Sequence, residues 1–293
     1  MIQLIKIMLP KEISKVIVPP IKCQGIKTKL VPFIAKSVLW DGNGTWVEPF
    51  LGSGVVAFNI QPKKAILADK NEHIINFYKK IQTGEINSSM VREFLKENGE
   101  KLYKEGGDFY YKVREDFNQR QDSLSFLFLN RSCFNGVIRF NKKGKFNVPF
   151  CKKPDRFRSA YITKITNQVK VLENIIKDKD WKFVTADWRE TIGSARKGDL
   201  IYVDPPYIGR HTGYIDVWAQ QEAEDLTSAL KRSSAGFALS MWIENKYRKN
   251  QYVIDYWDDY ERKTLNHFYH VGSQESLRNS MEEGLIMKSG CFA

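Results

Sequence analysis

The sequence is poor in residues that bind metals or form disulfides. It contains four cysteines and four histidines in 293 residues. No two cysteines form a C-x-x-C pair, and the close histidine pair His267 and His270 has no cysteine pair to complete a zinc site. We therefore expect no metal ion, and we expect free thiols in a reducing cytoplasm for the four cysteines, Cys23, Cys133, Cys151 and Cys291.

Long apolar runs and internal repeats are also missing, as is the G-x-x-x-x-G-K-[ST] phosphate loop. The short apolar stretch within residues 1–20 lacks a small-residue cleavage site, so we expect a cytoplasmic protein without a membrane partner. Without the phosphate loop, a nucleoside triphosphate is disfavoured as a ligand. Hydrophobic residues make up 42% of the chain, which is enough for a sizeable core.

Acidic residues are almost absent from one segment, residues 131–170, which holds eleven lysines and arginines against the single acid Asp155. This segment carries most of the net charge of +12. Such a distribution favours a nucleic-acid partner, because clustered cations neutralise phosphates. Aromatic side chains alternate with the charges and either contact bases or form the core of a basic subdomain: Phe134, Phe140, Phe146, Phe150, Phe157 and Tyr161.

Alternating strand and helix patterns indicate an α/β fold with a mostly parallel, doubly wound, Rossmann-like sheet. We expect strands at 45–50, 65–69, 181–185, 199–204, 235–241, 264–270 and 284–288. Helical patterns cover 55–60, 73–82, 88–104, 107–118, 122–130 and 161–177. The sheet is therefore predicted from residues 1–82 and 161–293, and residues 83–160 form an inserted helical and basic domain.

The segment EPFLGSGVV places Gly52 and Gly54 where a strand must turn sharply into a helix. Asp69 ends the next strand, seventeen residues after Gly52, and can accept both hydroxyls of a ribose. A short glycine turn with such an acid predicts a nucleoside cofactor without a pyrophosphate. Glu48 suits a positively charged ligand, or it is a solvated acid at the strand end.

The segment IYVDPPYIGR ends a buried strand at Asp204, because Pro205 and Pro206 cannot continue it. The Asp204 carboxylate and the Pro205 carbonyl can each accept one N–H of an amino group on a flat ring, and Tyr207 can stack on that ring. The alternative is a tight turn in which Asp204 caps a helix and Tyr207 only packs.

In the order EPFLGSG, LAD, LNRSCFNGVIRFNKKGKFNVPF and DPPY, these motifs resemble the Dam-type DNA adenine N6-methyltransferases, and particularly the EcoRV-type modification methylases. The likeness runs from about residue 19 to residue 288. It implies transfer of a methyl group from S-adenosylmethionine to a flipped adenine in double-stranded DNA, at the candidate site GATATC, by a monomeric enzyme of bacteria or phages within a restriction-modification system. The sheet would then be the catalytic domain, and residues 83–160 would recognise the DNA target.

The resemblance also implies roles for individual residues at the cofactor. Lys22–Lys27 correspond to a Lys-Trp-x-Gly-x-Lys motif, in which Lys27 would hold the methionine carboxylate and Cys23 replaces the tryptophan. Asp187 would lie near the cofactor adenine. The remaining cofactor contacts would come from Glu48, Pro49, Phe50, Gly52, Gly54, Asp69 and Asp204.

In the inserted domain, Asn135 and Arg139 resemble a DNA-contacting asparagine and a guanine-reading arginine. The other expected DNA contacts are Asn130, Arg131, Lys142, Lys143, Lys152 and Lys153. Two other readings remain open: an RNA or protein-amide methyltransferase of the same fold shares the cofactor turn, and a non-catalytic DNA-binding module explains the charge.

Overall fold

The computed structural model describes residues 8–206, 218–246, 249–268 and 280–288. Within these ranges the chain forms one sheet in the order β3-β2-β1-β4-β5-β7-β6. The first five strands in this order run parallel, whereas β7 is antiparallel to β5 and β6. The strands are β1 (Trp46–Glu48), β2 (Lys64–Asp69), β3 (Asp180–Thr185), β4 (Leu200–Val203), β5 (Gly236–Asn245), β6 (Glu261–Phe268) and β7 (Ser280–Lys288). The predicted mostly parallel, Rossmann-like α/β fold is confirmed.

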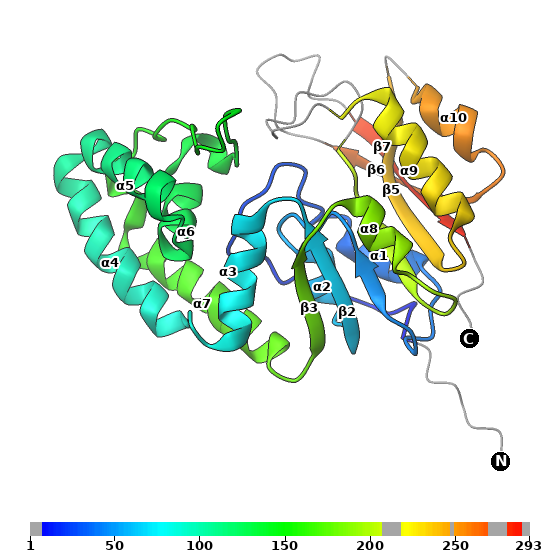
Figure 1. Cartoon of the computed structure of the whole chain (residues 1–293), viewed down its shortest axis with the longest axis horizontal. Helices are drawn as coiled ribbons and strands as arrows, with labels where there is room; N and C mark the ends of the chain where they lie inside the picture. Colours follow the sequence, from blue (N-terminus) through cyan, green and yellow to red (C-terminus); the bar gives the residue numbers. More distant parts are fainter. Residues whose placement is uncertain (1–7, 207–217, 247–248, 269–279, 289–293) are drawn as a thin grey trace.

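Side chains of the central strands alternate between two cores, because successive residues of a strand point to opposite faces. On β4, Leu200 and Tyr202 belong to one core and Ile201 and Val203 to the other. Figure 1 shows α8 and α9 in front of the sheet and α1 behind it. The first core packs against α1 (Val31–Ser37), α2 (Val55–Ile60) and α3 (Glu72–Thr83), and the second against α8 (Trp188–Gly193), α9 (Gln220–Arg232) and α10 (Gln251–Trp257).

Between α3 and β3 the chain forms a helical region that lies to one side of the sheet in Figure 1. Of the aromatic residues interleaved with its charges, Phe140, Phe146, Phe150 and Phe157 are buried and form its core, whereas 55% of Phe134 is exposed. The elements are α4 (Ser88–Glu105), α5 (Gly107–Arg120), α6 (Ser123–Ser132), the 3-10 turns η1 (Phe134–Gly136) and η2 (Pro154–Phe157), and α7 (Ser159–Ile176).

Asn130, near the end of α6, joins this helical region to the N-terminal segment. Its side-chain oxygen accepts the Lys22 N–H at 2.8 Å, and its amide nitrogen donates to the Lys22 carbonyl at 2.9 Å and to the Gly136 carbonyl at 3.2 Å. Asn130 is fully buried, so leaving these groups unpaired would cost stability. The segment that begins at Lys22 is thereby held at a fixed position between the helical region and the sheet.

Candidate functional site

A glycine turn connects β1 to α2 at the carboxyl edge of the sheet. Gly52 and Gly54 have φ angles of 51° and 73°, which favour glycine. A Cβ atom on Gly54 would lie 2.4 Å from the Phe58 ring, so no larger residue fits without a shift. The turn is fixed to the neighbouring strand because the Leu51 N–H donates to the Ala68 carbonyl at 2.8 Å. The sequence predicted this turn correctly.

Asp69 closes the turn from the end of β2. Its Oδ2 accepts the Gly52 N–H at 2.8 Å and its Oδ1 accepts the Asn71 N–H at 2.8 Å. Burial raises the pKa of Asp69, and these two N–H groups oppose the rise. A carboxylate has about four lone-pair sites, so each oxygen keeps one for a further donor. Two hydroxyls of a ribose would fit this acceptor set.

Cys23 lies over the same turn, since its Sγ is 4.0 Å from where a Cβ on Gly52 would stand. Burial raises the pKa of its thiol, and the nearby Asp69 carboxylate adds to the rise. Cys23 is therefore a neutral, small side chain beside the turn. It leaves more room there than a tryptophan would.

Asp204 follows β4 directly and pairs with a lysine from the N-terminal segment. The Lys27 ammonium lies 2.8 Å from Asp204 Oδ1 and 3.3 Å from the Gly25 carbonyl. Only 6% of the Lys27 side chain and 21% of the Asp204 side chain are exposed. Burial opposes the charge of Lys27, but the Asp204 carboxylate together with weaker contributions from Glu283 and Tyr202 outweighs it and holds the pKa of Lys27 above its ordinary value. Burial likewise raises the pKa of Asp204, and Lys27 opposes that rise.

Two further buried carboxyl groups make this edge of the sheet acidic. Glu48 ends β1, is 2% exposed and accepts the Trp46 indole N–H at 3.0 Å. Burial raises the pKa of Glu48 to about 8, although the Trp46 bond opposes the rise. Glu283 on β7 is 1% exposed. Its charge also raises the pKa of Lys27, by less than the charge of Asp204 does. Glu283 was not identified from the sequence, although it takes an inward position between the buried Met281 and Leu285.

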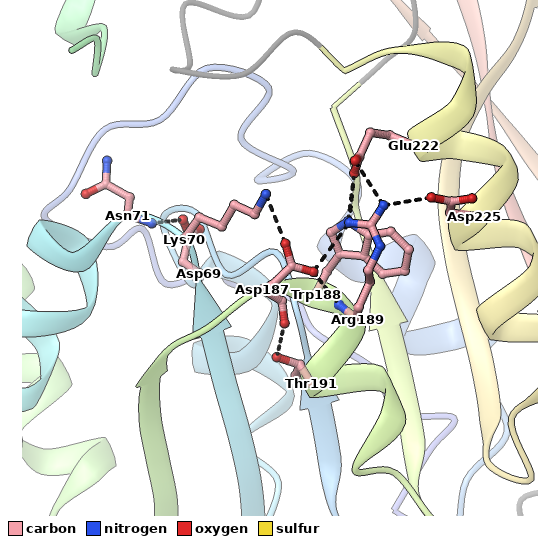
Figure 2. Close-up of polar contacts among 9 residues, drawn as sticks. All are labelled: Asp69, Lys70, Asn71, Asp187, Trp188, Arg189, Thr191, Glu222 and Asp225. Carbon is pink, nitrogen blue, oxygen red and sulfur yellow. Dashed lines mark hydrogen bonds and ion pairs between the residues drawn. The ribbon is translucent and has the colours of Figure 1, made fainter. Parts of the chain in front are cut away.

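Asp187 caps α8 and is held by cations on two sides (Figure 2). Its Oδ1 accepts the main-chain N–H of Arg189 at 2.8 Å and lies 3.6 Å from the Arg189 guanidinium. On the other side, the Lys70 ammonium lies 3.0 Å from Oδ2. Burial disfavours the charged carboxylate, but these donors outweigh it and hold the pKa of Asp187 below its ordinary value. Asp69 thus ends β2 and Asp187 follows the neighbouring strand β3, with Lys70 between them in Figure 2.

Arg189 ties this loop to α9. Its guanidinium lies 2.9 Å from Glu222 and 2.8 Å from Asp225, and it covers the Trp188 ring at 4.3 Å. Glu222 also accepts the Trp188 indole N–H at 3.1 Å. The Trp188 ring is stacked with that of Phe50 at a centroid distance of 6.5 Å. Phe50 directly precedes the glycine turn, so the ion pairs of Arg189 with α9 (Figure 2) hold the Trp188 ring beside that turn.

A cavity of about 320 Å³ opens beside the two prolines. Its lining includes Pro205, Pro206, Trp218, Trp242 and Tyr256, and the described residues of the lining contain one acid and no lysine or arginine. Aromatic walls without a cation suit a flat, uncharged ring rather than a phosphate. Tyr207, the expected stacking residue, lies outside the described residues.

The expected DNA contacts fall into two groups. Asn130 and Arg131 are buried, and both donate hydrogen bonds to main-chain carbonyls of the N-terminal segment. Arg139 is exposed, and its guanidinium donates to Asn147 Oδ1 at 2.8 Å. The others of this set are exposed: Asn135, Lys142, Lys143, Lys152 and Lys153. Asn135 has a φ of 54°, which turns the chain at η1.

In the part of the chain that the structure describes, no group of three or more His, Cys, Asp or Glu side chains is placed to hold a metal ion. No described helix combines the length and the apolar character needed to cross a membrane.

A mostly parallel sheet in this order, with a glycine turn after β1, an acid at the end of β2 and acids after β3 and β4, is that of a Rossmann-like methyltransferase fold. Residues 24–271 match the sequence model of the D12 class N6 adenine-specific DNA methyltransferases. The chain belongs to this family of enzymes.

Three relatives illustrate the similarity. The chain is 33% identical over 211 residues to the type II methyltransferase M.MjaIII of Methanocaldococcus jannaschii, covering 64% of this chain and 68% of that protein. It is 34% identical to a DNA adenine methylase of Serratia marcescens, over 64% of this chain and 70% of the relative. It is 36% identical to the DNA adenine methylase of Vibrio cholerae, but over 55% of each chain, so it spans about half the length of that relative.

Proposed function

We propose that this protein transfers the methyl group of S-adenosylmethionine to the N6 atom of adenine in duplex DNA. One observation carries the proposal. Asp204 stands at the end of β4, paired with Lys27 at 2.8 Å and followed by two prolines that stiffen the turn. Beside it lie a glycine turn and Asp69, which fit a nucleoside, and a cavity that fits a flat ring.

The residues around the turn fit the proposed cofactor. Asp69 keeps free lone pairs for the ribose hydroxyls, and Asp187 together with the Trp188 ring suits the adenine end. Asp204 and the buried carboxyl groups of Glu48 and Glu283 lie around the edge where a positively charged methyl donor would bind. When bound, S-adenosylmethionine supplies an electrophilic methyl group on a sulfonium, whose thioether is a good leaving group.

The turn after β4 would prepare the adenine amine for attack. That amine is a poor nucleophile because its lone pair is delocalised into the ring. Asp204 and the Pro205 carbonyl each accept one N–H, which favours a pyramidal nitrogen with its lone pair directed at the methyl group. The new N–C bond forms as the S–C bond breaks, and the nitrogen then loses a proton. Tyr207 would stack on the ring and fix its plane.

The adenine amine is inaccessible within a duplex, so the base must be flipped out at a cost of roughly a few kcal/mol. The exposed cations of residues 131–170 would offset this cost through phosphate contacts. We therefore propose a catalytic domain formed by 1–82 and 161–293 and a target-recognition domain formed by 83–160. The motif likeness to EcoRV-type methylases leads us to propose GATATC as the target, a modification role and a monomeric enzyme.

A single incubation with tritiated S-adenosylmethionine tests the proposal, with GATATC-containing duplex DNA, RNA and protein as parallel acceptors. Label should enter adenine of the duplex only. Label in RNA or protein would point to another methyltransferase of this fold, and duplex binding without any label would point to a non-catalytic module.

Asp204→Ala and Asp204→Asn provide the matched variants for this assay. Both should lose methyl transfer while keeping duplex binding, because the basic segment is unchanged. Methylation by Asp204→Ala within about tenfold of the parent would contradict the proposed role of the carboxylate.

A further inference from the structure

Three cations gather where the helical region meets the N-terminal segment. The Arg131 and Arg156 guanidinium groups lie 4.9 Å and 4.4 Å from the Tyr161 ring centroid. Arg156 Nε donates to the Arg131 carbonyl at 2.8 Å, which holds the two arginines together. Lys22 completes the group, because its main chain is hydrogen-bonded to Asn130, the residue before Arg131, and Arg131 Nη1 bonds the nearby Pro20 carbonyl.

This cluster lacks a counter-charge among the described residues. Arg131 is 4% exposed, and its Nη1 donates to the Pro20 carbonyl at 3.0 Å, but its buried Nε has no hydrogen-bond partner. Arg156 Nη2 donates to the neutral Tyr161 hydroxyl at 2.8 Å. The adjacent acid, Asp155, is engaged by Arg158 instead.

The absence of a carboxylate has an energetic consequence. Burial, followed by repulsion from Arg131 and Arg156, lowers the pKa of Lys22 to about 8. A buried charge is stable only when it is paired. An anion at this position would restore the full charge of Lys22 and balance the buried charge of Arg131.

The position of the cluster indicates which anion it meets. Lys22 begins the segment that leads to Lys27 and Asp204, and Asn130 fixes its main chain. Lys152 and Lys153, both exposed, precede η2, which contains Arg156. An anion held here would lie between the basic segment and the edge of the sheet that carries Asp204.

We propose that Lys22 and Arg156, with the buried charge of Arg131 behind them, form a phosphate-binding site. Resting on the proposed function, its occupant is a phosphodiester of the DNA backbone close to the target nucleotide. Guanidinium groups present paired N–H donors that match phosphate oxygens, and the ammonium adds a point charge. Sequence is not read here, since phosphate contacts set position only.

The test compares duplex binding by the parent, Lys22→Met and Arg156→Gln between about 50 and 200 mM salt. Lys36→Met is the matched control, because Lys36 lies outside residues 131–170, is exposed and is already paired with Glu12. Each site variant should flatten the slope of log K against log[salt] by about one, and the control should not change it. Binding of S-adenosylhomocysteine by each variant verifies that it is folded.

A second set of duplexes carries one neutral methylphosphonate linkage at successive positions. At one position near the target adenine, the neutral linkage should weaken binding of the duplex to the parent protein. The same linkage should leave binding to Arg156→Gln unchanged. The proposal is wrong if the site variants keep the salt slope of the parent and no methylphosphonate position distinguishes the parent from Arg156→Gln. If inorganic phosphate stabilises the parent and not the variants while duplex binding is unaffected, the site holds free phosphate and the DNA assignment is wrong. Methylation of duplex DNA by the parent is scored separately, so a failure of the proposed function is distinguishable.

Discussion

Replacing Lys27 by methionine would leave Asp204 without its cation and should move the pH range of methyl transfer. Two unit charges about 4 Å apart attract by about 4 kcal/mol at an effective dielectric constant of 20. Because 21% of the Asp204 side chain reaches solvent, we discount this by about half. The remaining ~2 kcal/mol corresponds to a rise of one to two in the pKa of Asp204, at about 1.4 kcal/mol per pH unit.

The sign follows from the charge that the reaction needs. Asp204 accepts an N–H as a carboxylate, so activity falls as the pH drops through its pKa. Burial already raises that pKa and Lys27 opposes the rise. Lys27→Met removes the opposing charge, and the acidic limb of the rate profile should therefore shift upward by about one to two pH units.

The assay measures initial rates of duplex methylation against pH, at saturating S-adenosylmethionine and DNA. Lys36→Met is the matched control: Lys36 also forms an ion pair, with Glu12, but both side chains are largely exposed. Its profile should equal that of the parent. If Lys27→Met raises only the KM for the cofactor and leaves the acidic limb in place, Lys27 acts on the methionine carboxylate alone and the reasoning above is wrong.

Three other predictions follow from the site and the exposed basic loop. Asp69→Asn should weaken S-adenosylhomocysteine binding about 10- to 150-fold, because hydrogen bonds to a charged group contribute about 1.5–3 kcal/mol. If calorimetry shows unchanged affinity, Asp69 does not bind the cofactor and only accepts the Gly52 N–H. A pKa of about 8 for Glu48 means that the folded state holds its proton more tightly than the unfolded chain, so the stability from this group is present below about pH 4.5 and is lost as the pH rises towards 8. Glu48→Gln should flatten this decline in the free energy of unfolding, measured by urea titration across the range, and a parallel decline in parent and variant would refute the assignment. Arg139→Ala should cost about 1 to 3 kcal/mol on GATATC and relax discrimination at the guanine, whereas Lys142→Ala should weaken binding to every duplex alike. A panel of duplexes in which each base of GATATC is replaced in turn checks this. If Arg139→Ala weakens binding equally to all of these duplexes, Arg139 contacts the DNA phosphates and does not read the guanine.

Much of the fold was predictable because local patterns agree with the tertiary structure. All seven expected strands are present. Strand–helix alternation predicted the parallel part of the sheet, and β7 differs by pairing antiparallel with β5 and β6. Four helices lie where we expected no element. α1 and α10 have seven residues each and α8 has six, too short for a helical period to stand out. In α9, however, the buried Ala223, Leu226 and Leu230 follow the helical spacing and were a readable signal.

The site was predictable in its parts but not in its pairings. The glycine turn and the acids after β2, β3 and β4 come from local sequence. The contact between Lys27 and Asp204 joins segments far apart in the chain, and only the fold brings them together. The burial of Asn130 and Arg131 could not be predicted either. Both are polar residues at the end of an apolar helix, and no local pattern indicates that their side chains are buried.

The helical region leaves and rejoins the sheet at a single border. The chain departs after β2 and returns as β3, and these strands pair over six residues with β3 at the outer edge of the sheet. No other strand needs to move when the intervening segment changes in length or sequence. A different segment could be grafted between these strands if it ends in a helix equivalent to α7 and keeps a residue that binds the Lys22 main chain as Asn130 does. Under the proposed recognition role of residues 83–160, exchange of this segment would change the DNA sequence that the same site methylates.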